Sequence, residues 1–345
     1  MKPSSAILAL ETLTAIRQPA MLWGAPGVGK SAIIRQLCDR HNLQMIDVRA
    51  TLLDPTDLRG LPSKGDNGSV QWLRPSFLPT SGAGVIFFDE INAAPQATQA
   101  ACYQCILDFR LGDFPLPPNW VPMGAGNRES DRAVVSRMPS ALANRFVHLD
   151  VETDLDDWSA WALGTDGANI EDVTPILPER PNLPISISSI AFARFRPALL
   201  HSFDPTRNDR AFPTPRTCEV ADRIIQANPP QEILYDLLAG TCGEAWAAER
   251  LAFERIYKTL PSPDAIIMAT DTAPVPTDPA TIYATIGALT RKATAATVDA
   301  LMIYANRLPA EFGMLMIRDM LRTQPQLAST RAYIAWATEH ANILL

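Results

Sequence analysis

Apolar residues occur in two patterns that alternate over the first half of this chain. Short runs of mostly apolar residues predict five strands, at residues 20–23, 43–48, 85–88, 120–125 and 146–151. Between these runs, apolar residues three or four positions apart predict helices, at residues 4–17, 32–42 and 95–109. Uninterrupted apolar strands that alternate with helices are typical of a parallel sheet covered on both faces. The pattern therefore predicts a three-layer α/β/α domain with a parallel five-stranded sheet.

The second half of the chain shows the helical spacing without strands. It predicts helices at residues 186–200, 216–227, 231–260, 282–305, 310–322 and 330–345. Stretches rich in proline, glycine or aspartate separate groups of these helices. We therefore expect an α/β domain at residues 1–165, a linker with a helical lid at 166–269, and a helical C-terminal extension at 270–345. Two segments rich in glycine and proline are expected to be inserts in the α/β domain, the first with a hairpin: 54–79 and 111–119.

The charge balance bears on the class of partner. The 345 residues carry a formal net charge of −7. A broad nucleic-acid surface needs clustered lysine and arginine, so this balance argues against nucleic acid as a partner. It does not exclude a pore lined locally by basic residues. We find no apolar run of the ~18 residues that a membrane span needs, and no secretory signal. We therefore expect a cytoplasmic protein.

The cysteines show no pattern typical of a disulfide framework. They are five in number and irregularly spaced. Cys102 and Cys105 have C-x-x-C spacing, but they fall within a predicted helix, and no second pair follows at the spacing of a zinc ribbon. We expect both to be buried on a helix face.

A complete G-x-x-x-x-G-K-S phosphate loop follows the first predicted strand and precedes a predicted helix. Its residues are Gly24, Ala25, Pro26, Gly27, Val28, Gly29, Lys30 and Ser31. The glycines let the backbone N–H groups surround a phosphate, and the N-terminus of the helix favours an anion. The motif assigns Lys30 to the β- and γ-phosphates and the Ser31 hydroxyl to Mg²⁺. With Ala32, which opens the helix, these residues form the predicted nucleotide-binding set.

Two carboxylates end the third predicted strand. Asp89 is placed to hold Mg²⁺ through water, and Glu90 to polarise the water that attacks the γ-phosphate. A small-molecule kinase does not need the second carboxylate because its nucleophile is the substrate. The pair therefore favours hydrolysis over the alternative of a solvated acidic pair at a strand end.

Asn127 follows the fourth predicted strand. The carboxyl edge of a parallel sheet faces the ligand, so the Asn127 carboxamide can orient the same water. The alternative is an asparagine in an ordinary turn.

Three arginines are further candidates. Arg145 precedes the fifth strand and is the favoured arginine to reach the γ-phosphate of a neighbouring subunit, with Arg137 as its rival or partner. The alternative for either is a surface ion pair. Arg216 begins a helix of the second half and is a candidate to contact the nucleotide within one chain; an exposed arginine at a helix start is the alternative.

In this order the motifs resemble those of AAA+ ATPases and, more narrowly, of the MoxR family within the helix-2-insert clade. The resemblance covers residues 21–151, with a weaker one over 216–225. The matching segments are GAPGVGKS for Walker A, VIFFDEIN for Walker B, GAGN for sensor 1, SALANRF for the arginine finger, FPTPRT for sensor 2, and DPTDLRGLP at the start of the insert. The chain departs from the family at Arg128, where proline is usual, and at Asn144, where aspartate is common.

The resemblance implies an ATP hydrolase that assembles into a ring, expected to be a hexamer, with ATP and Mg²⁺ between subunits. It also implies a chaperone-like action on a protein client, with a von Willebrand factor A domain protein as partner. Two other functions stay open: a nucleotide-dependent scaffold or switch with little turnover, and a DNA-directed motor, against which the acidic balance argues.

Overall fold

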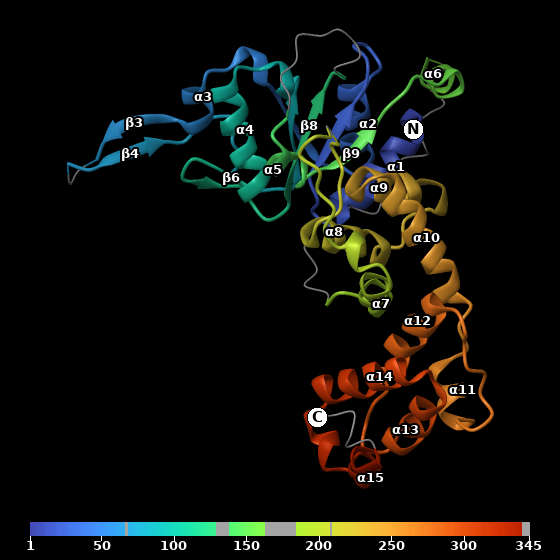
Figure 1. Cartoon of the computed structure of the whole chain (residues 1–345). Helices are drawn as coiled ribbons and strands as arrows, with labels where there is room; N and C mark the ends of the chain where they lie inside the picture. The colour runs from blue at the N-terminus through green and yellow to red at the C-terminus, as the bar shows by residue number, and fades with distance from the viewer. Residues whose placement is uncertain (66–67, 129–137, 163–183, 208, 340–345) are drawn as a thin grey trace. The chain divides into compact units, whose positions relative to one another are not determined.

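The computed structural model describes residues 1–65, 68–128, 138–162, 184–207 and 209–339 (Figure 1). The chain forms two compact units. The first comprises Met1–Pro184 with Ser202–Ala247, and the second Ile185–His201 with Ala248–Leu345. This grouping into two units does not test the three-part division expected from sequence, which stays a prediction.

The first unit contains the predicted five-stranded parallel sheet. Its order is β2-β5-β8-β1-β9, and every pairing is parallel. The strands are β1 (Ala20–Trp23), β2 (Gln44–Arg49), β5 (Gly84–Asp89), β8 (Trp120–Gly126) and β9 (Val147–Asp150). Because β1 lies between β8 and β9, the carboxyl ends of these three strands meet at one edge. This order and the flanking helices confirm the three-layer α/β/α domain with a parallel five-stranded sheet that the sequence predicts.

Helices cover both faces of the sheet. On β5, Ile86 and Phe88 pack with buried residues of α4 (Gln96–Asp108), which places that helix on one face. Neighbouring strand residues point to the opposite face, where α2 (Lys30–Arg40) contacts β2 and β5. Beyond α2 packs α1 (Pro3–Ala15). The short helices here are η1 (Ala50–Leu52), α3 (Pro55–Arg59), η2 (Ile91–Ala93), α5 (Ser140–Ala143) and α6 (Leu155–Ala162).

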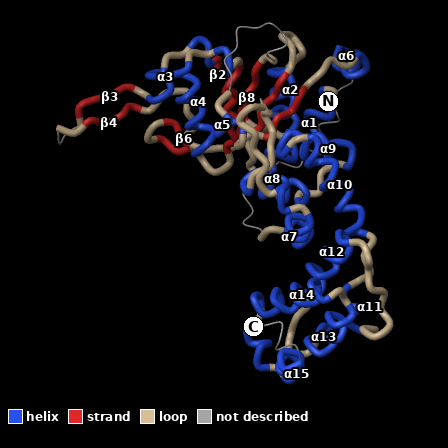
Figure 2. The backbone as a smooth tube through the Cα atoms, viewed as in Figure 1, coloured by secondary structure: helices blue, strands red, loops and turns tan. Residues whose placement is uncertain are grey.

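Each predicted insert holds or borders an antiparallel hairpin. The first pairs β3 (Leu61–Lys64) with β4 (Val70–Leu73), as expected from sequence, and the second pairs β6 (Arg110–Leu111) with β7 (Phe114–Pro115). Figure 2 shows the β3–β4 hairpin extending from the body of its unit. Its apolar side chains are exposed: Leu61, Val70, Trp72 and Leu73.

Two helices complete the first unit beside β9. They are α8 (Pro215–Gln226) and α9 (Gln231–Cys242), which contact each other. A Cβ on Gly240 would lie 2.0 Å from the carbonyl oxygen of His148, so only glycine allows α9 this approach to β9. The sequence pattern runs unbroken over 231–260, but Gly243, with a φ of 93°, separates α9 from α10 (Glu244–Lys258).

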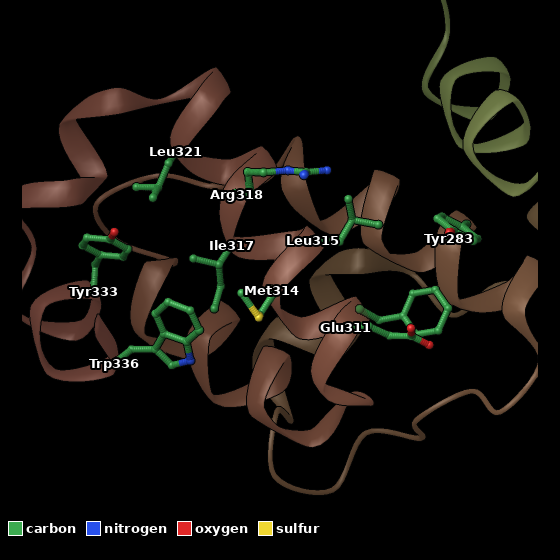
Figure 3. A pocket seen from close by; sticks show the side chains of 10 residues that line it. Tyr283, Glu311, Met314, Leu315, Ile317, Arg318, Leu321, Tyr333 and Trp336 are labelled. Carbon is green, nitrogen blue, oxygen red and sulfur yellow. The ribbon is translucent and has the colours of Figure 1, made fainter. Parts of the chain in front are cut away.

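The described part of the second unit is helical. It comprises most of α10 together with α7 (Ile187–Phe195), η5 (Pro197–Leu199), α11 (Pro263–Met268), α12 (Pro279–Thr290), α13 (Val298–Arg307), α14 (Ala310–Thr323), η6 (Pro325–Ser329) and α15 (Arg331–Glu339). Residues of α12, α14 and α15 line a cavity of about 540 Å³ (Figure 3). The helix predicted at 282–305 is divided into α12 and α13 by a turn, and Pro197 ends α7 before residue 200.

Candidate nucleotide-binding and hydrolysis site

The phosphate loop lies between the end of β1 and the start of α2. Gly27 and Gly29 have φ angles of 81° and 95°, a conformation that favours glycine, and a Cβ on either would meet only open space. No side chain caps the first turn of α2, so its N–H groups are available to a ligand. The loop is therefore an open cradle of N–H donors, which fits a phosphate.

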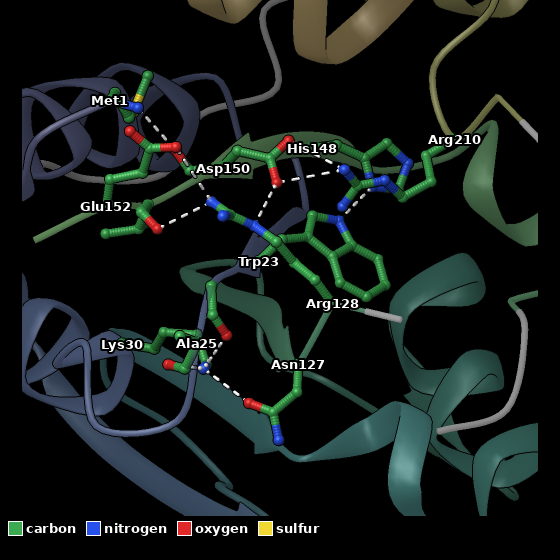
Figure 4. A network of polar contacts seen from close by, with 12 residues as sticks. Met1, Trp23, Ala25, Lys30, Asn127, Arg128, His148, Asp150, Glu152 and Arg210 are labelled. Atoms are coloured by element: carbon green, nitrogen blue, oxygen red, sulfur yellow. Dashed lines mark hydrogen bonds and ion pairs between the residues drawn. The ribbon is translucent and has the colours of Figure 1, made fainter. Parts of the chain in front are cut away.

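Lys30 connects this loop to the neighbouring strand. Its side chain is buried, and its ammonium donates hydrogen bonds to the carbonyl oxygens of Gly24 at 2.7 Å and Ala25 at 3.1 Å. It also donates to the carboxamide oxygen of Asn127 at 3.0 Å (Figure 4). The positive charge of Lys30 is thus held against the phosphate loop.

Ser31 and Asp89 meet at the carboxyl edge of the sheet. The Ser31 hydroxyl donates to Asp89 Oδ2 at 2.8 Å. Burial, and after it the Asp89 carboxylate, raises the pKa of Asp47 on β2. Hard oxygen atoms beside a phosphate cradle are the ligands that Mg²⁺ prefers, so the residues present fit this ion.

Glu90 is exposed and has a left-handed backbone conformation, with a φ of 53°. Its N–H donates to Asp89 Oδ1 at 2.9 Å, and the hydroxyl of Thr51 donates to its Oε2 at 3.3 Å. Thr51 lies in η1, just after β2, and sequence reasoning missed it. The pairing of β2 with β5 brings the two residues together.

Asn127 is held from a second direction by Asn92, another residue that sequence reasoning missed. The buried Asn92 carboxamide nitrogen donates to the backbone oxygen of Asn127 at 2.9 Å. A Cβ on Gly126 would lie 2.5 Å from Asn92 Oδ1, so Gly126 permits this close packing. The loop after Asp89 is thereby joined to the end of β8.

The outcome differs for each of the three arginine candidates. Arg145 is half-buried, and among the described residues its guanidinium has no hydrogen bond or ion pair. Arg137 lies outside the residues that the structure describes. Arg216 is exposed on α8, whose capping residue Thr214 donates to Asn144 Oδ1 at 3.0 Å. Asn144 precedes β9, so this hydrogen bond holds the start of α8 against the segment that leads into that strand.

A cluster around Asp150 at the end of β9 lies next to the site (Figure 4). The Asp150 carboxylate accepts hydrogen bonds from Arg128 at 3.1 Å and from Arg210 at 3.0 Å. The Arg210 guanidinium also lies 4.7 Å from the centre of the Trp23 ring. Sequence reasoning noted Arg128 only as a departure from a family pattern.

A cavity of about 730 Å³ opens beside the phosphate loop. Gly27, Val28 and Gly29 form part of its wall, and α1 and α2 form another part. The two tryptophans of α6, Trp158 and Trp161, also line it and are more than half exposed. An apolar cavity with aromatic side chains suits a planar base.

The cysteines have the buried position expected of them. Cys102 and Cys105 lie on α4 with no exposed surface, and burial raises the pKa of both thiols. Among the described residues, no group of three or more histidine, cysteine or acidic side chains is arranged to hold a metal.

Residues 20–148 match the sequence profile of the ATPase family associated with various cellular activities, abbreviated AAA. The chain carries an AAA ATPase domain. The AAA match runs from β1 into β9 and includes the phosphate loop, both acidic residues and Asn127. Arg210 and Arg216 lie beyond it.

Two individual proteins are similar to this chain. Midasin of Giardia intestinalis is 29% identical in an alignment over 163 residues, and the alignment covers 44% of this chain but only 3% of midasin. A crystal structure of a Cytophaga hutchinsonii protein, provisionally named an ATPase, has a TM-score of 0.47 and 16% identity, over 79% of this chain and 90% of that one. Among the described helices, none is long and apolar enough to cross a membrane.

Proposed function

We propose that this chain hydrolyses ATP with Mg²⁺ at the carboxyl edge of its sheet. The observation that carries the proposal is the convergence on that edge of a phosphate cradle, a buried ammonium, a hydroxyl–carboxylate pair and a second carboxylate. Lys30 lies 3.0 Å from Asn127, and Ser31 lies 2.8 Å from Asp89. This is the arrangement that phosphoryl transfer to water requires.

Each residue has a defined task in this reaction. Lys30 and the first N–H groups of α2 bind the β- and γ-phosphates, and Ser31 with Asp89 holds Mg²⁺. The ion, when bound, neutralises charge on the phosphate oxygens. Glu90 accepts a proton from the attacking water, and Asn127 orients that water. The carboxamide nitrogen of Asn127 points away from Lys30, so it is not used by the lysine (Figure 4).

The cavity beside the loop holds the nucleoside. Because Gly27–Gly29 form both the cradle and part of the cavity wall, a base linked to the bound phosphates reaches Trp158 and Trp161. Indole rings stack on a planar base, which favours nucleoside triphosphates over other phosphate compounds.

The finer function is a ring of subunits that remodels a protein client, as the MoxR resemblance implies. Arg145 supports a shared site because its half-buried guanidinium has no partner among the described residues. In a hexameric ring it reaches the γ-phosphate of the next subunit and stabilises the charge of the transition state. A von Willebrand factor A domain protein is the proposed partner.

One observation favours a second function, a nucleotide-dependent switch with little turnover. The Thr51 hydroxyl donates to Glu90 Oε2, so this oxygen must give up that hydrogen bond before it can accept a proton from the attacking water. Turnover measured with and without a partner protein distinguishes the two functions.

The test is phosphate release from ATP by the purified chain, with and without Mg²⁺, together with the mass of the assembly in ATP. We expect Mg²⁺-dependent release and an assembly larger than one chain. The variant Arg207→Ala, which removes an exposed ion pair with Asp209, is a control that keeps the activity. Release that does not need Mg²⁺, or that persists in Glu90→Gln, would contradict the proposal.

A further inference from the structure

We propose that Arg128 is a positioning residue for hydrolysis, acting through Asp150 to hold the Asn127 carboxamide against Lys30. The inference rests on the proposed ATPase function and adds to it a residue that has no direct part in the proposed reaction. Three observations carry it: the contacts of Arg128 with Asp150 and Val151 at the end of β9, the sharing of Asp150 with Arg210, and the way these contacts surround the phosphate loop.

Arg128 fixes the backbone that follows Asn127. Its Nε donates to Asp150 Oδ1 at 3.1 Å, and its Nη2 donates to the carbonyl oxygen of Val151 at 3.1 Å. A guanidinium with two such contacts has a defined orientation. Asn92 holds the backbone oxygen of Asn127, in the peptide bond that joins it to Arg128, at 2.9 Å. The backbone directly after the Asn127 side chain is therefore held by two residues.

Asp150 connects this arrangement to the strand that leads into the phosphate loop. Arg210 donates to both oxygens of Asp150, at 3.2 and 3.0 Å, and packs over the ring of Trp23. Trp23 is followed directly by Gly24, whose carbonyl oxygen accepts a hydrogen bond from Lys30.

Together these contacts form a continuous ring of interacting residues around the phosphate loop. It runs from Lys30 to Asn127, through Arg128 and Asp150 to Arg210, and back through Trp23 and Gly24 to Lys30. Gly24 also packs against Val151, since a Cβ on it would lie 2.8 Å from the Val151 oxygen that Arg128 binds. Both ends of the Lys30–Asn127 hydrogen bond are therefore held to one carboxylate, which fixes the geometry that hydrolysis needs.

Because Asp150 has two arginine partners, the role of Arg128 can be tested by removing its side chain. Arg128→Ala leaves Asp150 paired with Arg210, so this carboxylate keeps a cationic partner in the variant. Arg128 and Asp150 are partly exposed, at 26% and 45% of their side-chain surface, and the loss of such a pair has a small effect on stability. We expect the variant to keep its fold and to lose the restraint on Asn127.

The experiment is a double-mutant cycle on kcat with wild type, Arg128→Ala, Asn127→Ala and the double variant. Variants that turn over ATP slowly are measured under single-turnover conditions. We expect Arg128→Ala to lower kcat about tenfold with KM for ATP and Tm nearly unchanged, and Arg128→Lys to recover part of the loss. In the Asn127→Ala background, removing Arg128 should cost less than about twofold. Arg207→Ala is the matched control.

Equal losses in the two backgrounds, or an unchanged kcat in Arg128→Ala, would overturn the inference and leave the ATPase function standing. A wild-type chain that shows no Mg²⁺-dependent hydrolysis would overturn the proposed function, and with it the inference. A loss that appears only in KM would also overturn it, because Arg128 would then act on nucleotide binding.

Discussion

The ammonium of Lys30 donates a hydrogen bond of 3.0 Å to the carboxamide oxygen of Asn127, although 97 positions separate the two residues. This bond joins the phosphate loop after β1 to the end of the neighbouring strand β8. The other acceptors of Lys30 are two carbonyl oxygens of the loop itself. A γ-phosphate that binds Lys30 therefore competes with Asn127 for its ammonium.

This competition gives the first prediction. Asn127→Ala should lower ATP turnover about 10- to 100-fold, because the water loses its orienting group. It should leave ATP affinity unchanged or tighter, because Lys30 loses a competing acceptor. Steady-state phosphate release and calorimetric titration check the two effects, with ADP affinity as the internal control. A weakened ATP affinity with normal turnover would assign Asn127 to binding instead.

The second prediction concerns the catalytic base. Glu90→Gln should reduce turnover by about 10²–10⁴-fold, because the amide cannot accept the proton of the attacking water. ATP binding should persist, because Glu90 is exposed and is not part of the phosphate cradle. Turnover close to wild type would show that another group acts as the base.

The third prediction tests whether the site is shared between subunits. Arg145→Ala should abolish turnover, and mixing it with Glu90→Gln should restore part of it, because some interfaces then combine an intact base with an intact arginine. Subunit exchange is checked by light scattering or by labelled subunits. The matched control mixes Arg145→Ala with a chain carrying both substitutions, which should restore nothing. A lack of recovery in rings shown to be mixed would place Arg145 outside the neighbouring site.

The sheet could be predicted from sequence because each strand is a local feature. The runs that contain Phe87 and Trp120 are apolar throughout, as strands buried on both faces must be, and the structure confirms them as β5 and β8. The helix boundaries were harder, since apolar spacing continues past Gly243 while its positive φ ends α9. A periodic pattern does not record such a turn.

The site was predictable only where a local motif carries the chemistry. The phosphate loop and Asp89 lie where the motif indicates, and their meeting follows from the sheet order. Thr51 and Arg210 could not be found in this way, because their roles depend on contacts between segments far apart in the chain. Arg216 stays a prediction: the contact between Thr214 and Asn144 anchors its helix at the far end of β9.

The fourth prediction tests the nucleoside cavity. Trp158→Ala should weaken ATP binding about tenfold, since stacking on a base contributes roughly 1–3 kcal/mol. It should leave the affinity for tripolyphosphate unchanged, because that compound has no base. Trp72→Ala, which removes an exposed tryptophan of β4, is the matched control. An equal loss for ATP and tripolyphosphate would show that Trp158 supports the loop rather than the base.

The last prediction concerns His148, which is buried on β9 between Trp23 and Ala143. Trp23 Nε1 donates to its Nδ1 at 2.9 Å, so its Nε2 carries the hydrogen and donates to the Ala143 oxygen at 2.9 Å. Burial lowers the pKa of His148 from 6.5 to about 4, and the nearby Arg210 guanidinium adds to this effect. The folded protein therefore keeps this ring neutral in mildly acidic solution.

Between pH 6.5 and about 4 the unfolded chain binds a proton at His148 that the folded chain does not bind, so acid favours unfolding in this range. From neutral pH to about pH 5, the free energy of unfolding should fall by roughly 2 kcal/mol more in the wild type than in His148→Gln, whose side chain does not titrate. Urea unfolding of both proteins at a series of pH values measures the difference. Parallel curves would show that His148 is protonated in the folded state, which is incompatible with its acceptance of the Trp23 hydrogen bond.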